Sequence, residues 1–207
     1  MCKDRFDNTD ETVNKIKFHY KEDNKESIKK DIAKKILKKF MNSNKEELVV
    51  VNIGTDRCIG DAVAPLVGTL LERDKSEITH YGSCIEPIHA LNIDSRLEEI
   101  NKKHPNAFVV GVDACLGDKE EIGTIMYREK AISPGKGVGK TLPDVGDCSI
   151  VGVVDSSESA TFFSSKSIRL SFIMELSENI ADIVKELNNE NNLRYTKDFM
   201  EKSVVNA

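Results

Sequence analysis

Two aspartates stand where an α/β protein places its chemistry. Asp61 follows the apolar run 48–53 and a glycine-containing turn, and Asp113 directly follows the apolar run 107–112. Both runs are short, β-branched and bounded by Gly, Pro or charge, which is typical of buried strands in a parallel sheet. Ligands bind outside the carboxyl ends of such strands. The two carboxylates are therefore predicted to meet at one edge of the sheet.

Neighbouring carboxylates cannot both ionise freely, so the pKa of one rises and the pair divides into an acid and a base. That division is what water-mediated peptide hydrolysis requires. The same pair could instead bind a divalent metal ion, completed by a histidine, and His80 and His89 after the second expected strand are the candidates. Each aspartate also has a structural interpretation, Asp61 as a helix N-cap and Asp113 as an Asx turn.

Other residues at the same edge are weaker candidates. Cys115 could be a nucleophile, but no histidine is placed by the sequence to activate it. Asp155 ends a further apolar run and supplies a third edge carboxylate. Asp56 and Arg57 lie in the loop before the first aspartate and are candidates to contact a substrate.

A glycine- and proline-rich stretch over residues 133–147 must be a loop, and its segment 139–141 matches the end of a P-loop. Pro134 stands where that motif needs its first glycine, and the residues after it include a proline and a glycine that oppose the required helix. A nucleotide site is therefore disfavoured. We expect a flexible loop over the site, with Lys136 and Gly137 contacting the substrate.

The elements that must position these residues alternate along the chain. Strands are expected at 48–53, 78–83, 107–112, 122–127 and 149–154, and helices at 61–73, 92–104 and 166–188. Their β-α-β order predicts a three-layer α/β/α domain with a mostly parallel sheet. This domain is expected over residues 47–190, followed by a polar C-terminal tail over residues 191–207.

Residues 1–46 are rich in Lys, Asp, Glu and Asn. Apolar residues recur at helical spacing between Ile28 and Phe40, with six lysines from Lys29 to Lys39 around them. The pattern predicts a helical N-terminal extension that docks on the domain and leaves a solvated lysine face. A membrane-surface helix or an inhibitory prosegment is the alternative.

The composition is that of a globular chain: 207 residues, 39% hydrophobic and 31% charged, with a formal net charge of −5. The absence of Trp and the negative charge argue against nucleic-acid binding. No apolar stretch reaches the roughly 20 residues of a membrane span, and we expect neither a membrane partner nor a signal peptide. Five cysteines without a CxxC pair indicate reduced thiols in the cytoplasm and no structural zinc site.

Four ordered motifs resemble those of the YyaC-like sporulation proteins, and the resemblance covers residues 47–180. The motifs are GTDRCIGDAVAPLVG at 54–68, VDACLG at 112–117, SPGKGVG at 133–139 and LPDVGD at 142–147. That family is similar, more remotely, to the germination protease of bacterial spores and to the hydrogenase-maturation endopeptidases. The resemblance implies a phosphorylase/hydrolase-like fold and an aspartic-type peptidase.

By this resemblance Asp61 and Asp113 are the catalytic pair, and no cofactor is needed. In the maturation endopeptidases acidic residues at corresponding places recognise nickel with a histidine, which implies Asp61, Asp113 and His89 as alternative ligands of a divalent metal. One departure is Ala64, which stands where these families tend to carry glycine.

The expected function is peptide-bond hydrolysis in the cytoplasm of a spore-forming bacterium, the forespore included. The implied partner is a protein substrate such as a small acid-soluble spore protein, and a homo-oligomer is left open. The alternatives are a metal-dependent maturation-type endopeptidase and a non-catalytic regulatory or binding protein with the same fold.

Overall fold

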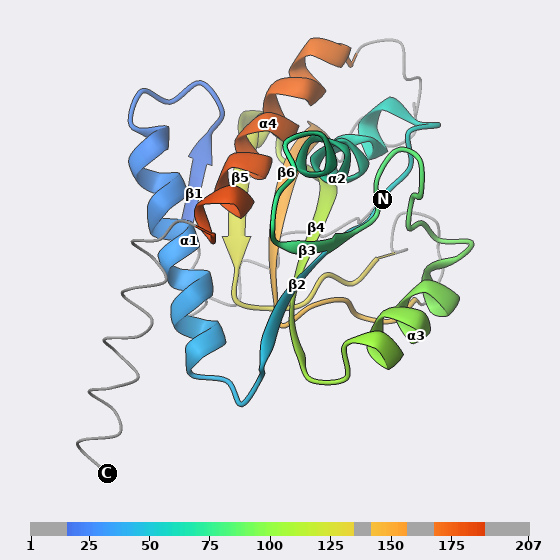
Figure 1. The fold of residues 1–207 in the computed structure, drawn as a ribbon. Helices are drawn as coiled ribbons and strands as arrows, with labels where there is room; N and C mark the ends of the chain where they lie inside the picture. The colour runs from blue at the N-terminus through green and yellow to red at the C-terminus, as the bar shows by residue number, and fades with distance from the viewer. Residues whose placement is uncertain (1–15, 135–141, 157–167, 189–207) are drawn as a thin grey trace, which may run out of the picture.

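The computed structural model describes residues 16–134, 142–156 and 168–188 (Figure 1). The strands are β1 (Ile16–His19), β2 (Glu47–Asn52), β3 (Thr79–Tyr81), β4 (Ala107–Gly117), β5 (Thr124–Arg128) and β6 (Cys148–Ser156). The helices are α1 (Lys25–Met41), α2 (Val63–Arg73), α3 (Ile93–Lys103) and α4 (Leu170–Glu186), with short 3₁₀ turns at Ile59–Asp61 and Lys119–Glu121.

The strands form one sheet in the order β1-β5-β6-β4-β2-β3. β3, β2, β4 and β6 pair in parallel, whereas β5 runs antiparallel to β6 and β1 antiparallel to β5. The prediction of an α/β fold with a mostly parallel sheet is therefore confirmed. The continuous apolar runs of β2, β4 and β6 follow from burial of a parallel sheet on both faces.

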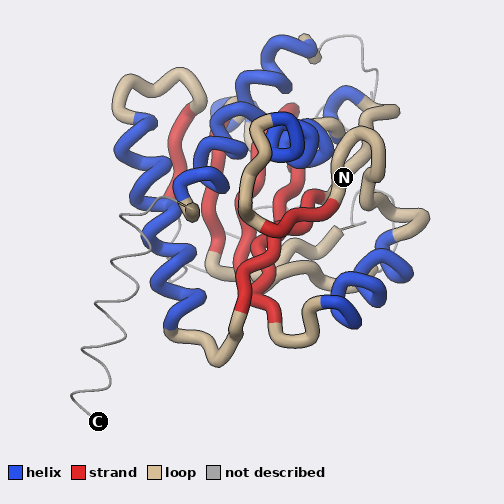
Figure 2. The backbone as a smooth tube through the Cα atoms, in the orientation of Figure 1, coloured by secondary structure: helices blue, strands red, loops and turns tan. Residues whose placement is uncertain are grey.

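Side chains alternate between the two faces of the sheet with a period of two. In β2, Val50 belongs to the large core that α1, α2 and α4 share, whereas Val49 and Val51 belong to a smaller core with α3. Figure 2 shows α3 well apart from the other three helices. The strand register thus decides which residues face α3, and the candidate site lies on that side.

The described part of the N-terminal extension supplies a strand and a helix of the same sheet and core. β1 pairs with β5, and α1 buries Ile32 and Ile36 in the core shared with α4. The expected helix is present, but the expected solvated lysine face is wrong at one position. Lys29 is only 3% exposed, because α4 covers it and its Nζ lies 3.0 Å from Asp182 Oδ2.

β4 is longer than predicted. It continues to Gly117 instead of ending at Val112, because β6 keeps pairing with it on one side, where Asp113 lies opposite Val151. On the other side β2 pairs with it only as far as Val112. Asp113 therefore lies within a strand and not after its end, but directly beyond the last residue pair of β2 and β4.

The helix predicted from Asp61 begins at Val63, so the interpretation of Asp61 as an N-cap is wrong. The 3₁₀ turn Ile59–Asp61 precedes the helix, and Ala62 takes the N-cap position. The turn forms because the Asp61 carbonyl accepts the N–H of Thr55 at 3.0 Å, which folds the loop back on its own start. The carboxylate therefore lies outside the helix.

None of the described helices is long and apolar enough to cross a membrane. The polar tail expected over residues 191–207 lies outside the described residues.

Candidate active site

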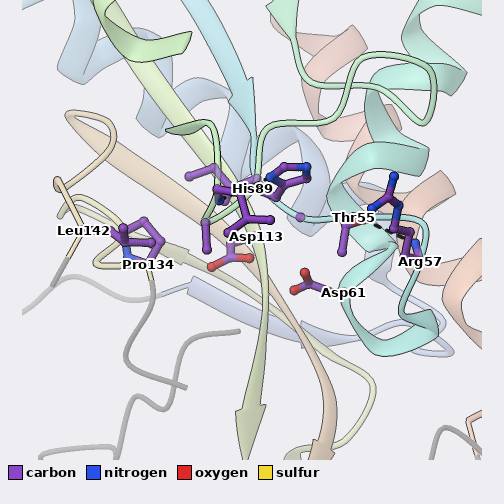
Figure 3. A pocket seen from close by; sticks show the side chains of 11 residues that line it. Thr55, Arg57, Asp61, His89, Asp113, Pro134 and Leu142 are labelled. Atoms are coloured by element: carbon purple, nitrogen blue, oxygen red, sulfur yellow. Dashed lines mark hydrogen bonds between the residues drawn. The ribbon is translucent and has the colours of Figure 1, made fainter. Parts of the chain in front are cut away.

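A pocket of about 220 Å³ beyond the end of β2 contains both predicted aspartates. It is lined by Ile53, Gly54, Thr55, Arg57, Asp61, His89, Ala90, Leu91, Asp113, Pro134 and Leu142. Figure 3 shows the two aspartates and His89 between Pro134 and Leu142 on one side and Thr55 and Arg57 on the other.

Asp113 reaches the pocket because β2 leaves the sheet just beside it. Directly after β2, the Ile53 N–H donates to the Val112 carbonyl of β4 at 2.8 Å. Asp113 is the next residue of β4, is 2% exposed, and accepts the Ala114 N–H on Oδ1 at 2.8 Å. β6 pairs with β4 on one side of Asp113, and the pocket lies where β2 has ended on the other side. The carboxylate is therefore held at the edge of a cavity.

His89 reaches the pocket from the opposite side through the same short segment. Ile53 forms a parallel bridge with Ile88, and the Gly54 N–H donates to the Ile88 carbonyl at 2.8 Å. His89 follows directly. Segments distant in the chain thus place an aspartate and a histidine on the two sides of Gly54.

Asp61 lies against Gly54 because that residue has no side chain. Gly54 has a φ of +151°, and a Cβ there would stand 2.2 Å from the Asp61 carbonyl oxygen. A left-handed or mirror-β backbone of this kind is accessible to glycine at little cost. Gly54 therefore allows the turn that carries Asp61 to pack on the end of β2.

Burial raises the pKa of the Asp61 carboxyl above its usual range, and a backbone hydrogen bond from Thr55 and the interaction with His89 oppose the rise. Desolvation disfavours the charged form of a carboxyl. Asp61 therefore keeps a proton to a higher pH than a solvated aspartate does, which is the property of a general acid.

The glycine-rich loop borders the pocket where the structure describes it. Ile132 and Val145 bond to each other through both N–H groups at 2.9 Å, and a Cβ at Gly111 of β4 would meet Ile132 Cδ1 at 2.7 Å. The base of the loop therefore lies flat on the face of β4 that also carries Asp113. The predicted contact residues Lys136 and Gly137 lie outside the described residues.

The remaining candidates divide by position. Arg57 is exposed and lines the pocket, whereas Asp56 is exposed and does not line it. His80 lies in β3 and Cys115 is fully buried among apolar side chains of β4, β5 and β6, so neither reaches the pocket. Asp155 also lies outside the lining, and its Oδ1 accepts the N–H of the next residue at 2.7 Å.

Within the three described segments, no group of three His, Cys, Asp or Glu side chains is arranged to hold a metal ion. Asp61, Asp113 and His89 line one pocket without forming such a group.

Sequence reasoning missed the apolar part of the lining. Leu91 is 81% exposed at the rim, and Ile53, Pro134 and Leu142 complete an apolar surface around the carboxylates. These residues come from three separate segments, and only their assembly in the fold makes them a lining. The signal available in the sequence was the position of Leu91 between His89 and a predicted helix start.

Comparisons with known proteins give relatives without a stated activity. The model of a family described as "Protein of unknown function (DUF1256)" matches residues 11–183. The "Uncharacterized protein YyaC" of Bacillus subtilis (strain 168) is 40% identical over 136 residues, which is 65% of this chain and 66% of that protein. The chain thus spans slightly less than two thirds of the length of this relative.

Proposed function

We propose that this chain, which belongs to the DUF1256 family of proteins of unknown function, hydrolyses peptide bonds with Asp61 and Asp113. The observation that supports the proposal is the presence of both carboxylates in one pocket, together with the burial that raises the pKa of Asp61. Two carboxyl groups in different environments can act as an acid and a base at the same pH.

In this proposal Asp61 holds the proton and Asp113 is the base. A water molecule gives one proton to Asp113 while its oxygen attacks the carbonyl carbon of the peptide bond. Asp61 then gives its proton to the amide nitrogen, and the C–N bond breaks. The proton on Asp113 returns to Asp61 through solvent, so the pair ends with the single proton with which it began.

The finer features that the family resemblance implies belong to the same proposal. They are a three-layer, phosphorylase/hydrolase-like architecture, a substrate such as a small acid-soluble spore protein, and action in the cytoplasm of a sporulating cell. Arg57 at the pocket rim is the described residue best placed to contact that substrate.

The experiment is incubation of the purified full chain with small acid-soluble spore proteins, with and without a chelator. Asp61→Asn and Asp113→Asn should lower kcat/KM by about 10²- to 10⁴-fold, the usual contribution of general acid–base catalysis. Asp155→Asn is the matched control, because that carboxylate lies outside the pocket, and it should keep wild-type activity. Circular dichroism should show an unchanged fold in all three variants.

Three outcomes contradict the proposal in different ways. Unchanged turnover in both pocket variants excludes the aspartate pair. Activity that the chelator abolishes and a divalent metal restores favours a metal-dependent endopeptidase. Stable capture of a spore protein without cleavage favours a non-catalytic binding protein.

A further inference from the structure

His89 is the third polar side chain in the middle of the pocket, and its backbone is held firmly. Its N–H donates to Asn92 Oδ1 at 2.8 Å, and its carbonyl accepts the N–H groups of Asn92 and Ile93 at 3.0 Å each. The Asn92 amide also donates to the Pro87 carbonyl at 2.9 Å. The start of α3 therefore forms a rigid base for the imidazole ring, as a catalytic group requires.

The hydrogen bond to the ring fixes which nitrogen carries the proton. The Leu91 N–H donates to His89 Nδ1 at 3.3 Å, so Nδ1 is an acceptor. In a neutral imidazole one nitrogen accepts and the other carries the proton. The proton of neutral His89 is therefore on Nε2, at the far end of the ring from its own backbone.

This tautomer is the wrong one for a metal ligand. A histidine that ligates a metal through Nε2 normally donates its Nδ1–H to a carboxylate or a carbonyl group, which keeps Nε2 free of a proton. At His89 the partner of Nδ1 is an N–H group, so the arrangement is reversed. An Nε2–H group is a hydrogen-bond donor, and a donor suits an oxygen that gains negative charge.

During peptide hydrolysis, negative charge develops on the carbonyl oxygen of the peptide bond. When water attacks the carbonyl carbon, the carbonyl oxygen takes up negative charge, and an N–H donor aimed at it stabilises the intermediate. Asp113 and Asp61 are occupied with the proton of the water and the proton for the leaving nitrogen. His89 lines the same pocket as both aspartates, so a peptide carbonyl bound between the aspartates lies in the same cavity as the imidazole ring.

We infer that His89 is a catalytic residue that donates a hydrogen bond from Nε2–H to the substrate carbonyl oxygen, and that it is not a metal ligand. The inference rests on the proposed peptidase function. His89 transfers no proton in this role, because its Nε2–H bond stays intact while the oxyanion forms and collapses.

The first test compares His89→Ala and His89→Gln with His80→Ala in the full chain. His89→Ala should lower kcat by about 10²- to 10³-fold with KM nearly unchanged, as the loss of an oxyanion donor does. His89→Gln, whose amide keeps an N–H donor, should recover most of that loss. His80→Ala should keep wild-type kcat, because His80 lies in β3 outside the pocket.

The second test does not depend on cleavage. Nitrogen-15 NMR of the imidazole should show a proton on Nε2 of His89, and calorimetric titration with Zn²⁺ or Ni²⁺ should give the same result for wild type and His89→Ala. A proton on Nδ1, or metal binding lost in His89→Ala, overturns the inference. Wild-type cleavage that persists in His89→Ala also overturns it but leaves the aspartate pair intact, whereas no cleavage by the wild type overturns the proposed function and the role of His89 together.

Discussion

Two partly buried aspartates, Asp61 in the pocket lining and Asp182 on α4, have pKa values shifted in opposite directions. Burial acts to raise the pKa of both carboxyls. At Asp182 the hydrogen bonds from Lys185 and Lys29, at 2.9 and 3.0 Å, outweigh burial and the pKa falls. At Asp61 the opposing interactions are smaller and the pKa stays raised.

The same residue type thus meets opposite electrostatic environments in two regions of the molecule. Asp182 joins two helices, because one lysine lies one turn further along α4 and the other comes from α1. Asp61 lies in a turn that packs on Gly54, and it lines a pocket with apolar residues such as Ile53 and Leu142. A carboxylate paired with cations keeps its charge to a lower pH than a solvated aspartate, whereas a carboxylate that burial destabilises gains a proton at a higher pH.

Gly54→Ala should have the largest combined effect on stability and cleavage in this comparison, because it disturbs the packing of the Asp61 turn. The new Cβ would stand 2.2 Å from the Asp61 carbonyl oxygen at a φ of +151°, so the turn must move. We expect about 1–3 kcal/mol of destabilisation in urea unfolding and about a 10²-fold loss of cleavage.

Gly152→Ala is the matched control for that variant. A Cβ at Gly152 meets no atom closer than 3.6 Å, so stability and cleavage should stay near those of the wild type. Equal effects of the two substitutions would show that the close approach at Gly54 does not position the site.

The next effect concerns the structural aspartate. Lys29→Met removes a buried ammonium that bonds to Asp182 Oδ2 at 3.0 Å and to Glu26 Oε1 at 2.7 Å. We expect a loss of about 1–3 kcal/mol in urea unfolding, less than for a fully buried pair because Asp182 is partly solvated. Lys30→Met on the exposed face of the same helix should change stability by less than about 0.5 kcal/mol. A Lys29→Met variant as stable as the control would contradict the pairing.

The stability that the ion pairs of Asp182 contribute should be smaller and should depend on pH. The lowered pKa of Asp182 means that its ion pairs stabilise the fold above the unfolded-state pKa of about 3.9 and lose this effect as the pH falls through the folded-state value. Asp182→Asn should therefore be less stable than the wild type by up to about 1 kcal/mol at pH 7, with the difference vanishing near pH 2. Thermal unfolding across this range measures it, and a difference independent of pH would exclude the charge as its cause.

The smallest effect should have the opposite sign. The raised pKa of Asp61 means that its contribution to stability is fully present below the unfolded-state pKa and is lost as the pH rises through the folded-state value. Asp61→Asn should thus raise the Tm by about 1–3 °C at pH 8 and by nothing below about pH 4. A lower Tm at pH 8 would show that the ionised carboxylate stabilises the fold.

The fold was accessible from the sequence wherever apolar periodicity was strong. For the strands β2, β4 and β6 and the amphipathic helices α2, α3 and α4, most of the predicted ends lie within a few residues of the observed ends. The end of β4 was missed because its continuation depends on pairing with β6, which begins only at Cys148, far beyond Gly117 in the chain. The burial of Lys29 was missed because only the packing of α4 on α1 covers it.

The candidate site was predicted in part for the same reason. From the sequence alone, Asp61 follows an apolar run and a glycine-containing turn, and Asp113 directly follows the apolar run 107–112. That the two aspartates share a pocket depends on tertiary contacts, because the Ile53 and Gly54 N–H groups bond to the Val112 and Ile88 carbonyls. The tertiary structure also decided that burial governs the proton on Asp61, because a pKa depends on distances between segments that lie far apart in the chain.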